Sequence, residues 1–130
     1  MIRVFVYGTL LQGESNYGIV APFVVQIEPG AVRGELFDAG EYPAIVVSDA
    51  DGCCESQRDA GAVAGEWLTV REQALAAMDE LELYYGPGDA RNDYERIVVH
   101  DIDGIRCGWA YVWNDSRGCV PIRSGNWRSR

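Results

Sequence analysis

The stretch TVREQALAAMDELELYY, residues 69–85, has the pattern of an α-helix. Small and apolar side chains recur in it at helical spacing. Thr69 and Glu72 have the spacing of a capping box, which predicts that the helix starts here. The pair Gly86-Pro87 follows, and proline ends helices because it lacks the amide that a further turn needs. The sequence therefore predicts one long helix that runs to about Tyr85.

Segments typical of β-strands surround this helix. They are residues 2–6, 23–27, 32–37, 44–47, 62–70, 94–100 and 105–113. Residues 101–104 (DIDG) predict a hairpin turn, residues 14–20 a short second helix, and the polar stretch 49–61 a surface loop. A parallel doubly wound fold needs more crossover helices than this. The pattern favours an α+β domain on a mixed or antiparallel sheet, which could close into a small barrel.

Length, composition and charge narrow the possible functions. The 130 residues are 48% apolar and 24% charged, which predicts a single globular domain over residues 1–130. The formal net charge of −9 argues against a nucleic-acid or anionic-membrane partner, because both require clustered basic residues. The N-terminus shows no signal-peptide pattern, and no apolar run could span a bilayer. We therefore expect a cytoplasmic protein.

The cysteine and histidine content predicts no metal site. Cys53 and Cys54 are adjacent, Cys107 and Cys119 stand alone, and His100 is the only histidine. No Cys-x-x-Cys pair or zinc ligand set can be assembled from these residues. We expect free thiols. The chain also lacks a P-loop and the glycine fingerprint of dinucleotide sites, so we expect no metal and no cofactor.

Glu82 is the residue that departs from the pattern of the predicted helix. On a helical wheel it falls inside the apolar face, between Leu75 and Met78. A carboxylate at a core-facing position is costly unless it is paired or protonated. One explanation is an ion pair with Arg96, or a rotated helix that leaves Glu82 at the boundary. The other is a carboxyl that faces a cavity, with a pKa raised for acid–base catalysis.

Two further segments have both a structural and a functional interpretation. Tyr7-Gly8-Thr9-Leu10 follows the first strand, and its successive amides could bind a small anion or could simply form a tight turn. Tyr94 and Arg96 share one face of their strand by alternation. They could clamp a substrate or merely line a barrel.

Several motifs, taken in order along the chain, resemble those of one protein family. They are VFVYGTL (residues 4–10), VRGELF (32–37), VAGEWL (63–68), MDELE (78–82), YER (94–96), AYVW (110–113) and IRSGNW (122–127). The chain is similar in these segments to gamma-glutamyl cyclotransferase-like proteins, in the AIG2-like branch that includes gamma-glutamylamine cyclotransferase. The resemblance covers nearly the whole chain.

The resemblance implies a fold, a set of site residues and a reaction. The fold is a small mixed β-barrel flanked by short helices. Tyr7, Gly8, Thr9 and Leu10 would hold the glutamyl end of a small-molecule substrate. Glu82 would be the general base and acid, and Tyr94 a neighbour in the pocket.

Leu83 follows Glu82 where many family members have glycine. This departure predicts that the helix continues beyond Glu82.

The implied reaction is an intramolecular cyclisation that needs no cofactor. The substrate's α-nitrogen attacks its own γ-carbonyl, and the products are 5-oxoproline and a free amine or amino acid. Two alternatives stay open at this point. The chain could be a non-catalytic domain that binds a small acid on the same loop, or a biosynthetic tailoring enzyme that removes a gamma-glutamyl protecting group.

Overall fold

The computed structural model describes residues 1–47 and 61–130. Its elements in chain order are β1 (Ile2–Val6), α1 (Tyr17–Val20), the 3₁₀ helix η1 (Ala21–Phe23), β2 (Val24–Asp38), β3 (Pro43–Val47), β4 (Ala62–Val70), α2 (Gln73–Leu81), β5 (Glu95–His100), β6 (Cys107–Val112), β7 (Val120–Pro121) and the 3₁₀ helix η3 (Trp127–Ser129). The predicted strands are confirmed, except that the two expected over residues 23–27 and 32–37 are one long strand, β2, and that Phe23 belongs to η1. The loop predicted over residues 49–61 lies almost entirely outside the described residues, as do Cys53 and Cys54.

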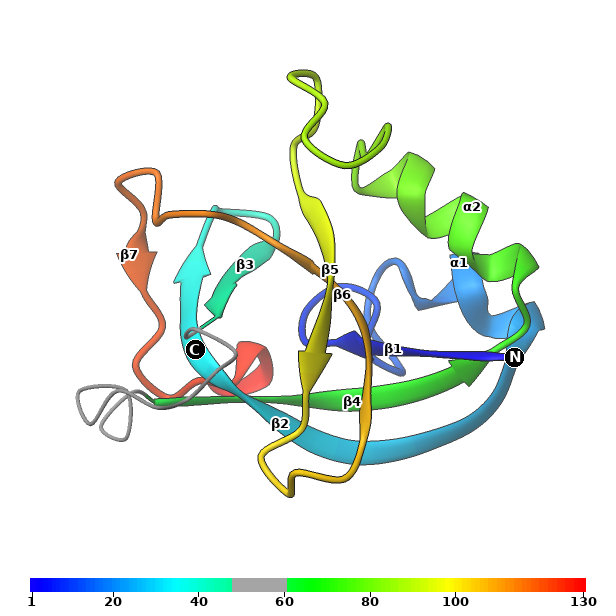
Figure 1. The fold of residues 1–130 in the computed structure, drawn as a ribbon. Coiled ribbons are helices and arrows are strands. Elements are labelled where there is room, and N and C mark those ends of the chain that lie inside the picture. The colour runs from blue at the N-terminus through cyan, green and yellow to red at the C-terminus, as the bar shows by residue number, and fades with distance from the viewer. Residues whose placement is uncertain (48–60) are drawn as a thin grey trace.

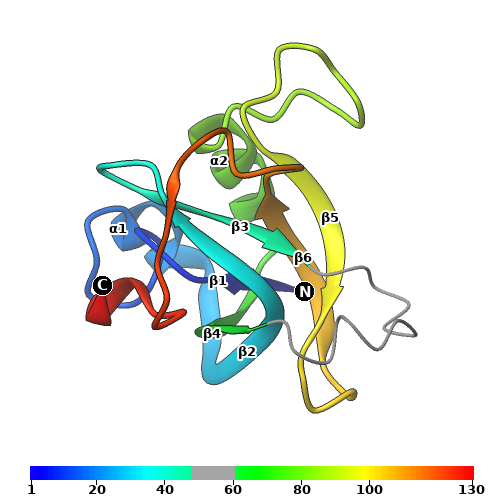
Figure 2. The same ribbon diagram turned by 90° about the vertical axis from the view of Figure 1, so that its left-hand side faces the viewer.

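The strands form one mixed sheet that is almost closed on itself. Their order is β3-β2-β4-β1-β6-β5, with β7 added on β2. β1 and β6 run parallel, and the other pairs are antiparallel. Figure 1 shows β2 and β4 as long curved strands, and Figure 2 shows β3 reaching across towards β6. There the Trp113 amide, just after β6, donates to the Ile45 carbonyl oxygen of β3 at 2.9 Å. This contact brings β3 and the end of β6 together and almost closes the barrel. The architecture is the expected α+β barrel with two short α-helices.

The core fills the inside of this barrel and extends under the helices. In β1 the consecutive residues Val4, Phe5 and Val6 are all buried, as expected for a strand covered on both faces. Ala74 and Met78 of α2 are fully buried as well. Burial of a large apolar side chain such as Val4, Phe5 or Met78 stabilises the fold by roughly 1.5–3 kcal/mol. α1 and α2 contact each other at one end of the barrel (Figure 1).

The start of α2 differs from the prediction. The helix begins at Gln73, and its N-cap, Glu72, makes no side-chain capping bond. Thr69 belongs instead to β4, where it pairs with Arg3 of β1 and Gln26 of β2. The predicted capping box is therefore wrong, because pairing with two neighbouring strands holds Thr69 in an extended conformation.

The end of α2 also differs from the prediction. The helix ends at Leu81 with Glu82 as its C-cap, and neither reaches Tyr85 nor continues through Leu83. The Tyr84 amide donates to the Asp79 carbonyl and the Leu83 amide to the Glu80 carbonyl, the bond pair of a Schellman motif. That motif needs a left-handed residue, and Leu83 has φ 53°. The chain reverses there, so Tyr84 is buried while Tyr85 is exposed.

The left-handed conformation of Leu83 should be measurable as strain. A side chain with a Cβ costs about 1–2 kcal/mol in this region, whereas glycine adopts it freely. We expect Leu83→Gly to be more stable than Leu83→Ala by about 1 kcal/mol in denaturant unfolding, although glycine normally destabilises a folded chain. An alanine variant at least as stable as the glycine variant would contradict this conformation.

Candidate active site

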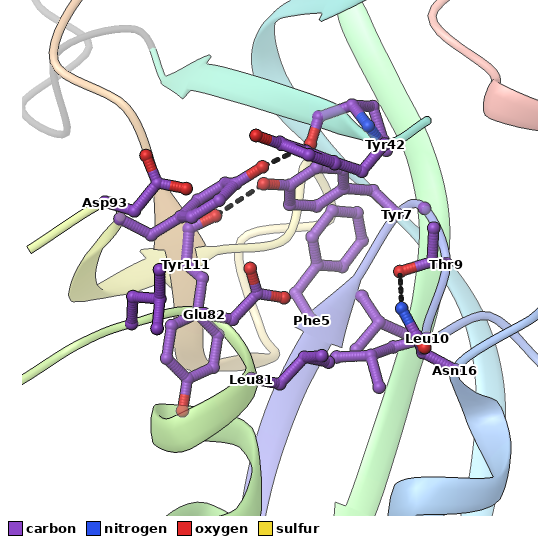
Figure 3. A pocket seen from close by; sticks show the side chains of 15 residues that line it. Phe5, Tyr7, Thr9, Leu10, Asn16, Tyr42, Leu81, Glu82, Asp93 and Tyr111 are labelled. Carbon is purple, nitrogen blue, oxygen red and sulfur yellow. Dashed lines mark hydrogen bonds between the residues drawn. The ribbon is translucent and has the colours of Figure 1, made fainter. Parts of the chain in front are cut away.

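A cavity of about 210 Å³ opens beside the end of β1. Its walls come from the loop after β1, the turn before β3, the end of α2, the segment before β5, and β6. All the residues that the sequence singled out for the site line it: Tyr7, Gly8, Thr9, Leu10, Glu82 and Tyr94. The structure thus brings together residues from three distant parts of the chain (Figure 3).

Glu82 projects its carboxyl group into this cavity from the end of α2. Figure 3 shows the carboxyl between Phe5 and Tyr111, facing the ring of Tyr7. The Glu82 amide still donates to the Met78 carbonyl at 2.9 Å, so the residue keeps the helical direction that the wheel assigned to it. Glu82 is the C-cap, so it is the last residue whose side-chain direction is set by the geometry of α2.

The environment of Glu82 favours the protonated acid. Burial, and to a smaller extent the nearby Asp93 carboxylate, raise the pKa of Glu82 to about 7. The negative end of the α2 dipole acts in the same direction. Within residues 1–47 and 61–130, no hydrogen bond or ion pair reaches the Glu82 carboxyl. A carboxyl that titrates near neutrality can both accept and return a proton at physiological pH.

The ion-pair explanation for Glu82 is wrong. Arg96 pairs with Asp79 instead, and its Nη1 lies 2.8 and 2.7 Å from the two carboxylate oxygens. Arg96 is also absent from the cavity lining, so it does not form a clamp with Tyr94. Among the residues that the structure describes, no cation pairs with the Glu82 carboxyl, so the structural role has no partner there.

The loop after β1 lines the cavity with Gly8, Thr9 and Leu10. Within the described part of the chain, the amides of Gly8, Thr9 and Leu10 donate to no protein acceptor. The loop is held instead through its carbonyl oxygens, which accept from Leu11 at Gly8 and from Asn16 at Thr9. Successive free amides at the edge of a cavity can bind a small anion.

Gly8 is required by close packing at this point. A Cβ on Gly8 would lie 2.4 Å from Cγ of Pro43, at the start of β3. Any side chain at this position would therefore force the loop and β3 apart.

The tyrosine hydroxyls at the site brace the barrel. Tyr7 donates to the Tyr111 carbonyl at 2.5 Å and accepts from the Ile45 amide at 3.3 Å. Tyr94 donates to the Pro43 carbonyl at 2.8 Å. Burial raises the pKa of both phenols, so both stay protonated. These two side chains present their ring faces to the cavity, and their hydroxyls are already engaged.

The sequence did not identify several residues of the site. Asp93 lines the cavity near Glu82 and forms a 2.7 Å ion pair with Arg117. The aromatic rings of Tyr42 and Tyr111 also line the cavity. Tyr42 is 39% exposed to solvent. Asp93 directly precedes the YER motif and Tyr111 lies in the AYVW motif, and that proximity was the only available signal.

No metal-binding cluster is found in residues 1–47 and 61–130, since no three His, Cys, Asp or Glu side chains there are arranged to hold an ion. Cys107 and Cys119 are free, as expected for these two positions. No helix in the described part of the chain is long and apolar enough to cross a membrane.

Comparison with known proteins identifies relatives over almost the whole chain. The family described as "Gamma-glutamyl cyclotransferase, AIG2-like" matches residues 4–129. A Niallia circulans protein, "Gamma-L-glutamyl-butirosin B gamma-glutamyl cyclotransferase", is 39% identical over 131 residues, which cover 98% of this chain and 76% of that protein. A "Putative gamma-glutamylcyclotransferase" of Vibrio cholerae is 32% identical over 130 residues, covering 98% of this chain and 96% of the relative.

Solved structures share the fold. YkqA from Bacillus subtilis superimposes with a TM-score of 0.70 at 27% sequence identity. The match covers 98% of this chain but only 40% of YkqA, so this chain corresponds to less than half of that protein.

The raised pKa of Glu82 should make stability depend on pH. Between about pH 4.5 and 7 the folded protein binds more protons than the unfolded chain, so the free energy of unfolding falls as the pH rises. Glu82→Gln removes this penalty. We expect the variant to match the wild type at pH 4.5 and to exceed it at pH 8 by at most roughly 3 kcal/mol in chemical denaturation.

Glu80→Gln is the matched control, because Glu80 is exposed on the same helix. Glu80→Gln should leave the pH dependence of the free energy of unfolding unchanged. A Glu82→Gln variant that is less stable than the wild type at pH 8 would mean that the carboxylate has a stabilising partner.

Proposed function

This chain belongs to the gamma-glutamyl cyclotransferase, AIG2-like family of enzymes, and we propose that it converts a gamma-glutamyl amine to 5-oxoproline and the free amine, with Glu82 as general base and acid. The observation that carries the proposal is the Glu82 carboxyl, which lines the cavity, has no partner among residues 1–47 and 61–130, and has a pKa raised to about 7.

The reaction requires proton transfer between two nitrogen atoms of the substrate. The α-nitrogen enters as an ammonium and must lose a proton before it can attack the γ-carbonyl carbon. The new C–N bond closes a five-membered ring, and the bond from the same carbon to the leaving nitrogen breaks. In total two protons leave the α-nitrogen and two arrive at the leaving nitrogen. Glu82 can carry them in turn, a role typically worth ~10²–10⁴-fold in rate.

The loop after β1 is placed to fix the substrate's α-carboxylate. The amides of Gly8, Thr9 and Leu10, which donate to no acceptor in the part of the chain that the structure describes, are donors of the right kind, and the substrate would then point its α-nitrogen towards Glu82. Holding the flexible glutamyl chain in a cyclising shape also lowers the entropic part of the barrier. The rings of Tyr7 and Tyr94 would supply apolar walls for its methylene groups.

The charges around the cavity favour an amine over an amino acid as the leaving group. The chain contains no lysine, and no arginine is among the described residues that line the cavity. Its ionisable acids besides the tyrosines are Glu82 and Asp93. A leaving group with its own carboxylate would meet these acids, and Arg117, which pairs with Asp93, lies outside the cavity lining and is already engaged.

A tailoring role is the second candidate. It is favoured by the 39% identity to the Niallia circulans relative, whose name refers to gamma-L-glutamyl-butirosin B. That compound therefore belongs in the substrate panel. We further propose that residues 1–130 act as one domain, in the cytoplasm and without a nucleic-acid partner, in keeping with the net charge of −9.

A substrate panel tests this proposal. The protein is incubated with a gamma-glutamyl alkylamine, the matching gamma-glutamyl amino acid, and the alkylamine substrate methyl-esterified at its α-carboxylate. We expect 5-oxoproline from the first and less from the second. The ester should react at least about tenfold less efficiently, because a charge-assisted hydrogen bond contributes about 1.5–3 kcal/mol.

Each arm can contradict a separate part of the proposal. Equal turnover of acid and ester would remove the loop amides from the site, and a preference for the amino acid would contradict the assignment of the leaving group. Binding of gamma-glutamyl compounds without any 5-oxoproline would leave the non-catalytic binding domain as the function.

A further inference from the structure

Asp79 lies one helical turn before Glu82 and is bound to two strands of the barrel. Its Oδ1 accepts from the Tyr111 hydroxyl of β6 at 2.6 Å. Both of its carboxylate oxygens accept from Nη1 of Arg96 of β5, at 2.8 and 2.7 Å. The side chain of a single helical residue thus joins the last turn of α2 to β5 and β6.

The partners of Asp79 are themselves held in place. The Arg96 guanidinium lies 4.9 Å from the ring centres of both Tyr84 and Trp109, and its side chain is 18% exposed. Burial and the Asp79 carboxylate raise the pKa of Tyr111, so its hydroxyl stays a donor. Charge-assisted bonds to a shielded group are stronger than those of an exposed ion pair.

The backbone of Asp79 holds the other side of the same turn. Its carbonyl accepts from the Tyr84 amide at 2.9 Å, the bond of the Schellman motif that spans more residues. This motif encloses Glu82 and the strained residue Leu83. Asp79 therefore binds the barrel through its side chain and the reversed chain beyond Glu82 through its backbone.

We propose that Asp79, held by Tyr111 and Arg96, is a positioning residue that fixes the direction in which Glu82 enters the cavity. Without this anchor, the turn containing Leu83 can relieve its strain, and Glu82 can rotate from the cavity towards water. The effect on turnover rests on the proposed function, whereas the effect on the orientation of Glu82 does not.

Tyr111→Phe tests the anchor without changing any charge. It removes the hydroxyl that binds Asp79 and keeps the ring in the cavity wall. The other ionisable groups close to Glu82, which are Asp93, Tyr7 and Tyr94, stay in place. A change in the titration of Glu82 would then report a change in its position.

Two readouts are measured on the intact protein. The first is the pKa of Glu82 from ¹³C NMR of its side-chain carboxyl, which needs no substrate. We expect a value below the wild-type value of about 7, because the group becomes more hydrated. The second is turnover of a gamma-glutamyl amine. We expect kcat to fall roughly ten- to a hundredfold, with KM changed less than about threefold.

Tyr84→Phe is the matched control, because the Tyr84 hydroxyl makes no hydrogen bond to the described residues. It should resemble the wild type in both readouts. Asp79→Asn is a second variant and should change both readouts in the same direction as Tyr111→Phe.

A wild-type pKa of Glu82 in both Tyr111→Phe and Asp79→Asn would overturn the proposal, and so would a loss of kcat that only follows a loss of folded protein. If neither the wild-type protein nor any variant releases 5-oxoproline, the proposed function is wrong. The NMR titration still decides whether Asp79 positions Glu82.

Discussion

The burial of one carboxyl group at the end of α2 is the constraint on which the site depends. Glu82 is half-buried beside the negative end of a helix dipole, with Asp93 nearby, and each of these conditions disfavours its ionised form. Such a position lowers stability at neutral pH and has to be compensated elsewhere in the fold. One turn earlier, the bonds of Asp79 to Tyr111 and Arg96 join the last turn of α2 to β6 and β5.

The remaining walls follow from the way the sheet closes. Because β3 approaches the end of β6, the Tyr7 hydroxyl can bridge the Ile45 amide and the Tyr111 carbonyl, while Tyr94 binds the start of β3. Their rings become rigid surfaces of the cavity. The loop after β1 and the Glu82 side chain line the same cavity.

Local patterns predicted much of this arrangement, and long-range contacts decided the rest. Alternation and turn residues located the strands, and the helical wheel identified Glu82 because helical geometry alone aims its side chain. The capping box failed because Thr69 pairs with two strands, and the end of the helix was misplaced because Leu83 adopts a conformation that glycine prefers. Asp93 has no spacing relation to Glu82, and its position directly before the YER motif did not show that it lies near Glu82 in the folded chain.

The pH dependence of kcat/KM shows whether a buried Glu82 is the base. With a gamma-glutamyl amine as substrate, we expect kcat/KM to fall on the acidic side with a midpoint near the Glu82 pKa of about 7, and no measurable activity in Glu82→Gln. A midpoint near pH 4.5, the value of an exposed carboxyl, would contradict the burial. An active Glu82→Gln protein would contradict the assignment of the base itself.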